Sequence, residues 1–246
     1  MSDSSTTASR LATPATGQPP RLTLEIFSDL RCPFCYLEVP EIEALKEHFA
    51  DEVAIHWRAF ELRPEPEPAL DPAGDYLNRL WQEAVLPMAT ERGLTMRQPT
   101  RQPRSRRALE AVAWAQRHHG QAAADTLRLA LFKGFFEDSL DLGDAESLGT
   151  VADEQGLDGH ALRMALAIDA DSESVAADRH LGQTLGIGGV PALRFLVDGE
   201  HAGILSGAQP RRQLLLAVER LRDALTQRDR QSQAPAAGAS ASQPKD

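Results

Sequence analysis

Hydrophobic and polar positions repeat with different periods in different parts of the chain. Side chains from Leu22 to Phe27 and from Val53 to Phe60 alternate with a period of two, which predicts two strands. Between these strands, apolar side chains recur every three or four residues, as on the buried face of a helix: Cys35, Val39, Ile42, Leu45 and Phe49. Pro33 suits the first helical turn, because its missing N–H would have no partner there.

A helical period then extends from Asp75 to about Ile168, and strand character returns after it. Apolar side chains in that segment predict a block of four or five helices, with Asp144 and Asp158 as N-caps of two of them. A further helix leads to the strands 192–197 and 201–205, which are joined by an Asp198-Gly199 turn. Pro210 opens a last helix.

This order of elements predicts an α/β fold in which helices flank a small mixed sheet, with an inserted all-helical subdomain. The sheet domain is expected to comprise residues 21–70 and 172–228, and the inserted helical subdomain residues 71–171. Residues 1–20 and 229–246 are rich in Ser, Ala and Pro or polar side chains and are expected to be disordered tails.

Composition narrows the class of protein. An apolar fraction of 42% is typical of globular proteins, and the apolar runs are shorter than the ~20 residues that span a bilayer. A net charge of -10 argues against nucleic acid as a partner. The N-terminal segment has neither the basic nor the apolar region of a secretory signal, so we expect a cytoplasmic protein whose thiols are kept reduced.

The chain has two cysteines, and they form the sequence Cys32-Pro33-Phe34-Cys35. Three interpretations compete: two buried thiols, half of a metal site, and a redox dithiol. A structural zinc ion needs four ligands, and no second cysteine pair or nearby histidine pair supplies the others. We therefore expect no metal in the single chain, although two chains could share one.

The predicted elements favour the redox dithiol. Cys32 would lie at the N-terminus of a helix, where the helix dipole and free N–H groups stabilise a thiolate. Cys35 would lie one turn further, on the buried face, and would attack the mixed disulfide that Cys32 forms with a substrate.

Several segments resemble the DsbA-like thioredoxin superfamily, and most closely its FrnE-like cytoplasmic branch of dithiol–disulfide oxidoreductases. The matching residues are Ser28-Asp29, Cys32-Pro33-Phe34-Cys35-Tyr36, Trp57-Arg58-Ala59-Phe60-Glu61-Leu62, Gly189-Val190-Pro191 and Ser206-Gly207-Ala208-Gln209-Pro210. The resemblance implies a thioredoxin-like fold, with a cis peptide bond at Pro191 beside the cysteines. It also implies that the Val190 backbone pairs with a substrate peptide, next to Pro33 and Phe34.

The chain also departs from related proteins. Thioredoxins often place a buried acid six residues before the first cysteine, where this chain has Ile26. The neighbouring Glu25 is expected on the other side of the sheet, and Asp29 is favoured as a turn or capping residue. The group that takes the proton of Cys35 is therefore open.

The sequence favours a thiol–disulfide oxidoreductase or isomerase that acts through Cys32 and Cys35. Its expected substrates are disulfide-bearing proteins or small thiol compounds, with glutathione or another thiol protein as electron donor and no other cofactor. One alternative is a glutathione-dependent transferase or isomerase of the kappa and hydroxychromene-carboxylate type. Relatives of that type usually have Ser at the position of Cys32. The other alternative is a non-enzymatic module that binds a peptide or a metal.

Overall fold

The computed structural model describes residues 20–233. Most of each expected tail, residues 1–19 and 234–246, therefore lies outside the described residues. The strands of this range form one mixed sheet in the order β2-β1-β3-β4. Strand β1 pairs parallel to β2 and antiparallel to β3, and β3 pairs antiparallel to β4. The strands are β1 (Leu22–Ser28), β2 (Val53–Ala59), β3 (Ala192–Val197) and β4 (Glu200–Ser206). This topology places β1 and β3, which border the cysteines and Pro191, side by side at the centre of the sheet.

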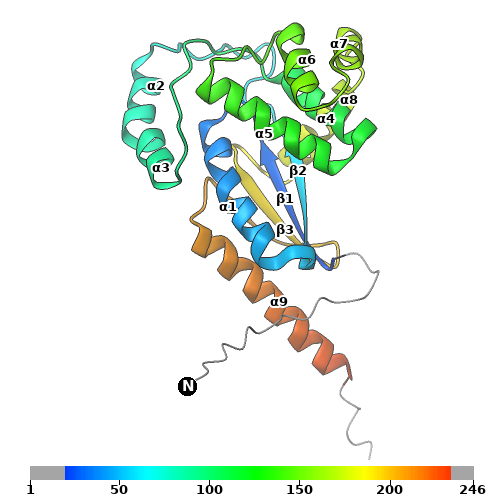
Figure 1. The fold of residues 1–246 in the computed structure, drawn as a ribbon. Coiled ribbons are helices and arrows are strands. Elements are labelled where there is room, and N and C mark those ends of the chain that lie inside the picture. The colour runs from blue at the N-terminus through cyan, green and yellow to red at the C-terminus, as the bar shows by residue number, and fades with distance from the viewer. Residues whose placement is uncertain (1–19, 234–246) are drawn as a thin grey trace, which may run out of the picture.

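Helices cover both faces of the sheet (Figure 1). Helix α1 (Pro33–Phe49) and helix α9 (Arg211–Gln233) bury the side of β1 that carries Leu24 and Ile26. Helix α8 (Ser172–Thr184) packs on the opposite side through Gly182, where a Cβ would lie 2.8 Å from the ring of Phe60. Because both faces are covered, β1 is buried along nearly its whole length.

The remaining helices lie between β2 and α8 in the chain. Helix α2 (Asp75–Leu80) continues through a π-helical turn (Trp81–Val85) into α3 (Leu86–Glu91). The others are α4 (Arg106–His119), α5 (Gln121–Glu137), α6 (Ala145–Glu154) and α7 (Gly159–Ala167). Asp144 and Asp158 cap α6 and α7 by accepting hydrogen bonds from backbone N–H groups, as predicted.

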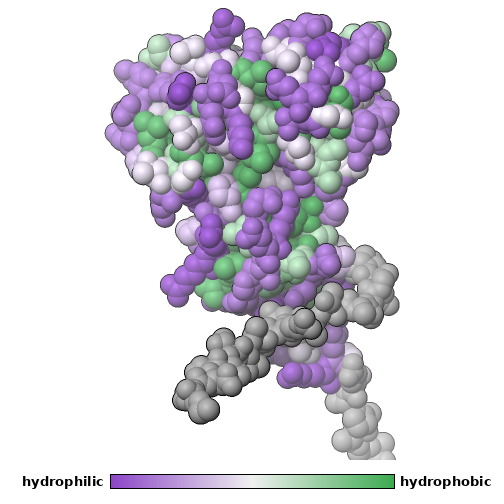
Figure 2. Space-filling model, in the orientation of Figure 1, coloured by the Kyte–Doolittle hydropathy of each residue, from purple (hydrophilic) through white to green (hydrophobic). Residues whose placement is uncertain are grey.

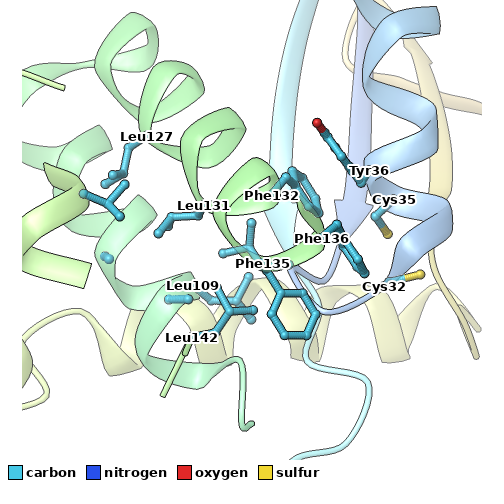
Figure 3. Close-up of a cluster of buried hydrophobic side chains, with 14 of the residues drawn as sticks. Cys32, Cys35, Tyr36, Leu109, Leu127, Leu131, Phe132, Phe135, Phe136 and Leu142 are labelled. Atoms are coloured by element: carbon cyan, nitrogen blue, oxygen red, sulfur yellow. The ribbon is translucent and has the colours of Figure 1, made fainter. Parts of the chain in front are cut away.

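One apolar cluster joins this helical region to the start of α1. Tyr36 of α1 stacks on Phe132 and Phe136 of α5, with ring centroids 5.4 and 5.8 Å apart. Figure 3 shows these rings beside Cys32 and Cys35, which belong to the same buried cluster. The helical region therefore covers the cysteine pair.

The predicted fold class is confirmed: the protein has a thioredoxin-like mixed sheet with flanking helices and an inserted helical region, α4–α8. Helix α9 continues past the expected end of the folded part at Arg228. Helix α8 contacts both β2 of the sheet and α4 of the helical region. These contacts do not separate two domains, so the boundaries at residues 71 and 171 stay a prediction.

The surface in the view of Figure 2 is mainly hydrophilic, with hydrophobic residues in separate patches. None of the helices in residues 20–233 combines the length and apolar character needed to cross a bilayer.

Candidate active site

The cysteine pair follows a tight turn at the end of β1. The Asp29 side chain holds this turn, because its carboxylate accepts hydrogen bonds from the backbone N–H groups of Arg31 at 3.1 Å and Leu62 at 2.8 Å. The Cys32 N–H donates to the Asp29 carbonyl at 3.0 Å. These bonds confirm the expected turn role of Asp29 and fix where α1 begins.

Cys32 is the N-cap residue of α1, and Pro33 occupies the first turn. That turn contains no acidic residue, so no carboxylate of α1 competes for the positive end of the helix dipole. The sequence therefore places Cys32 where a helix stabilises a negative charge.

Cys32 also contacts the segment that precedes β3. Its thiol donates a hydrogen bond to the Val190 carbonyl at 3.4 Å, and the Val190–Pro191 peptide bond is cis, as the resemblance implied. The antiparallel pairing of β1 with β3, in which Phe27 lies opposite Ala192, brings these distant segments together. Cys32 is only 5% exposed.

Cys35 lies deeper than Cys32 and has no exposed surface. Burial raises the pKa of its thiol well above the ordinary value, and hydrogen bonding to Cys32 raises this pKa further. Hydrogen bonds from the Ser28 hydroxyl and the Asp29 N–H act in the opposite direction. Both cysteines are free thiols in this structure.

The other predicted site residues surround the pair. Pro33, Phe34 and Val190 are half-buried, whereas Pro191 is buried. A cavity of about 440 Å³ lies beside Val190, lined by residues 185–190, Ile204, Ser206 and Gly207. The structure thus brings Val190 and Pro191 to the cysteines, and binding of a substrate by these residues stays a prediction.

The sequence did not reveal a network of buried charges beside the site. Glu25 pairs with Arg58 of β2 at 2.6 Å and with Arg194 of β3 at 2.9 Å. Arg58 also contacts Asp178 of α8, so Glu25 faces α8. The only sign of this network in the sequence was Glu25, a charged residue within the otherwise apolar strand β1. Its partners could not be predicted, because they depend on how β1 aligns with β2 and β3.

A second buried network ties α1 to the helical region and to the loop before α9. Glu38 accepts a hydrogen bond from the Gln209 N–H at 2.9 Å and pairs with Arg92 at 3.2 Å. Arg92 also donates to the Gln209 carbonyl at 2.8 Å. No pattern in the sequence indicated this network, because its members lie far apart in the chain.

Within residues 20–233, no group of three or more His, Cys, Asp or Glu side chains could hold a metal ion. The arrangement at the start of α1 is instead a pair of thiols, one at a helix N-terminus and one behind it. Such a pair can alternate between a dithiol and an intramolecular disulfide.

Fold and cysteine pair together define a thioredoxin-like protein of the DsbA type. The chain belongs to the DSBA-like thioredoxin domain family, whose model matches residues 23–219. Proteins of this family include oxidoreductases.

A curated relative and a solved structure are both similar to this chain. The uncharacterized protein YwbO of Bacillus subtilis (strain 168) is 33% identical over 147 residues, which is 58% of this chain and 70% of that protein. The structure of a probable DsbA oxidoreductase, SCO1869 from Streptomyces coelicolor, superposes with a TM-score of 0.67 at 26% identity, covering 82% of this chain and 90% of that one.

The cytosolic disulfide reductase DsbM from Pseudomonas aeruginosa shares the fold. Its structure gives a TM-score of 0.62 at 21% identity, covering 81% of this chain and 99% of that chain.

Proposed function

We propose that this protein is a thiol–disulfide oxidoreductase in which Cys32 attacks the substrate disulfide and Cys35 resolves the mixed disulfide. The observation that carries the proposal is the asymmetry of the pair. Cys32 lies at the N-terminus of α1 against the Val190 carbonyl, whereas Cys35 is completely buried behind it.

The first step takes place at Cys32. Its thiolate attacks one sulfur of a substrate disulfide, and the other substrate sulfur leaves as a thiolate. The backbone around Val190 lies beside the reacting sulfur, where an extended substrate peptide can pair with it. Phe34 and Pro33, both half-buried, supply the surface next to it.

The second step takes place at Cys35. Its thiolate attacks Cys32, the Cys32–Cys35 disulfide forms, and the remaining substrate sulfur leaves as a thiolate. Two protein thiols are thereby oxidised to one disulfide and one substrate disulfide is reduced to two thiols. Glutathione or another thiol protein would return the pair to the dithiol.

We propose further that the protein belongs to the FrnE-like branch and works in the cytoplasm. A reducing compartment keeps the pair as a dithiol, which favours reduction or isomerisation of substrate disulfides over net oxidation. The name of DsbM, a cytosolic disulfide reductase with the same fold, supports this direction.

The test is to equilibrate the protein in glutathione redox buffers, trap the thiols, and follow both cysteines by mass. We expect a reversible dithiol–disulfide transition. A midpoint near about −270 mV would identify a reductant, and one near about −120 mV an oxidant.

Two matched variants assign the roles. Cys35→Ser should accumulate the mixed disulfide on Cys32, because the resolving thiol is missing, and Cys32→Ser should form none. If the wild-type protein forms no intramolecular disulfide, or if Cys32→Ser keeps full activity on a disulfide substrate, the proposal is wrong. A protein that needs Cys32 but not Cys35 would instead fit a glutathione-dependent transferase.

A further inference from the structure

The segment that contacts Cys32 has few side chains to hold it in place. Glycines occupy positions 186, 188 and 189 just before Val190, and a Cβ added at any of them would meet nothing within 4 Å. The Val190 carbonyl accepts the hydrogen bond from the Cys32 thiol at 3.4 Å, and an incoming peptide would pair with this same backbone. The position of the backbone therefore depends on the segments that hydrogen bond with it.

One such segment is the turn of residues 206–210, which joins β4 to α9. The Gly207 N–H donates a hydrogen bond to the Pro191 carbonyl at 2.8 Å. Gly207 has a φ of +81°, a conformation that favours glycine, and the chain leaves the sheet at this point. Ser206 and Gly207 also line the cavity beside Val190. The turn thus contacts the backbone next to Cys32 through a single N–H whose direction matters.

The side chain of Gln209 closes this turn. Its Nε2 donates hydrogen bonds to the Ser206 carbonyl at 2.9 Å and to the Gly207 carbonyl at 2.8 Å. An amide nitrogen of glutamine has two N–H donors, so both are used within the turn. Gln209 is only 8% exposed, which limits the replacement of these bonds by water. The amide therefore fixes the direction of the Gly207 N–H.

The backbone of Gln209 is attached to the helix that carries Cys32. Its N–H donates to Glu38 of α1 at 2.9 Å, and its carbonyl accepts a hydrogen bond from Arg92 at 2.8 Å. Glu38 has no exposed surface and belongs to the helix of which Cys32 is the N-cap. Gln209 therefore fastens its turn to α1.

We propose that Gln209 is a positioning residue that holds the backbone of Val190 and Pro191 where a substrate peptide can pair with it beside Cys32. The inference rests on the proposed function and names the residue through which α1 sets the geometry of peptide binding. Gln209 acts through Gly207: its amide orients the Gly207 N–H, and this N–H holds the Pro191 carbonyl.

The test compares two probes that release the same chromophore. One is a short synthetic peptide whose cysteine carries thionitrobenzoate through a disulfide. The other is 5,5′-dithiobis(2-nitrobenzoic acid), which has no peptide backbone to pair with Val190. Attack by Cys32 releases thionitrobenzoate from either probe. Stopped-flow absorbance over a range of probe concentrations gives the half-saturation concentration and the limiting rate of this release.

The variant is Gln209→Met, which keeps the length of the side chain and removes both donors. Its matched control is Gln98→Met in the helical region. The Gln98 Nε2 likewise donates two hydrogen bonds, to the Pro72 carbonyl at 2.8 Å and to the Asn78 side chain at 2.9 Å. The control therefore removes a similar pair of bonds from a segment that does not contact Pro191.

We expect Gln209→Met to raise the half-saturation concentration of the peptide probe by about 5–20-fold, because two hydrogen bonds that hold the turn are lost. The limiting rate with the peptide and the rate with the second probe should stay as in wild type, as they should for both probes in Gln98→Met. A role in stability alone would lower the melting temperature without separating the two probes.

Hydrogen exchange of the Gly207 N–H is a second readout, and it does not depend on activity. This N–H should exchange faster in Gln209→Met than in wild type or Gln98→Met. If Gln209→Met does not fold, Gln209→Glu is measured instead, since it keeps the shape of the side chain but sets a carboxylate against the two carbonyls. The same changes are expected in that variant.

An unchanged half-saturation concentration for the peptide probe, or unchanged exchange of the Gly207 N–H, would overturn the role of Gln209. A wild-type protein that shows no saturation with the peptide probe would overturn it as well. A wild-type protein that reacts at Cys32 but forms no Cys32–Cys35 disulfide afterwards would instead overturn the proposed function. The two failures are therefore distinguishable.

Discussion

Glu38 should make the stability of this protein fall as pH rises through neutrality. Its side chain has no exposed surface, and burial raises its pKa from 4.5 to about 7 despite the hydrogen bond from Gln209 and the contact with Arg92. The pKa of Glu38 is higher in the folded protein than in the unfolded chain. The stabilisation that Glu38 contributes is therefore complete below pH 4.5 and is lost as pH rises through about 7.

The expected magnitude follows from the two pKa values. The interval from 4.5 to about 7 corresponds to about 3 kcal/mol in the free energy of unfolding. About 2–3 kcal/mol of this should be lost between about pH 5 and about pH 8, because part of the unfolded chain is already ionised at the lower pH.

The perturbation is Glu38→Gln, which keeps the shape of the side chain but cannot ionise. The free energy of unfolding is measured by denaturant titration at both pH values in the variant, in wild type, and in Glu43→Gln, a control at an exposed position of the same helix. Comparison with wild type is needed because burial also raises the pKa of other carboxyl groups: Asp29, Glu61, Glu110 and Asp178.

Relative to wild type, Glu38→Gln should gain about 2–3 kcal/mol between the lower and the higher pH, whatever constant offset the loss of the Arg92 contact introduces. Glu43→Gln should show no such gain. If Glu38→Gln differs from wild type by the same amount at both pH values, Glu38 is ionised in the folded protein across this range and the reasoning from its burial is wrong.

Two further predictions concern packing. Phe136→Ala leaves a cavity beside Tyr36 and should cost ~3–5 kcal/mol by denaturant titration, whereas Phe136→Leu refills most of the volume and should cost no more than ~1.5 kcal/mol. Equal losses would show that the stacking on Tyr36, and not the filled volume, decides the cost. Gly159→Ala would place a Cβ against the Gly149 carbonyl oxygen, so it should lower the melting temperature far more than Gly188→Ala, where nothing lies within 4 Å. Similar melting temperatures for these two variants would show that α6 and α7 can move apart at little cost.

The sequence predicted those parts of the molecule whose causes are local. The alternation in Leu22–Phe27 and the apolar spacing after Cys35 depend on neighbours within a few residues, and so do the caps at Asp144 and Asp158. The position of the cysteines at a helix N-terminus followed from the same patterns. The cis bond before Pro191 was implied by the resemblance and not by the residues themselves.

The parts that were not predicted depend on contacts between distant segments. Glu25 meets Arg58 and Arg194 only because β1 pairs with two strands in one particular register. A cavity of about 350 Å³ between β2 and helices α4, α5 and α8 is another such feature, because four separate elements enclose it. A pattern along the chain cannot report such a volume, because it arises only when the helices pack on β2.

The central place of β1 in the sheet also determines when the site can assemble during synthesis. Cys32 and the carbonyl it contacts at Val190 are separated by 158 positions in the chain. On the ribosome, β1 and β2 emerge early, but the other edge of β1 has no partner until β3 is made. A nascent chain therefore carries both thiols beside an unpaired strand edge, and such an edge is prone to aggregation. Because the helical region α4–α8 is translated before β3, it is available to bury Cys35 while the chain waits for its last strands.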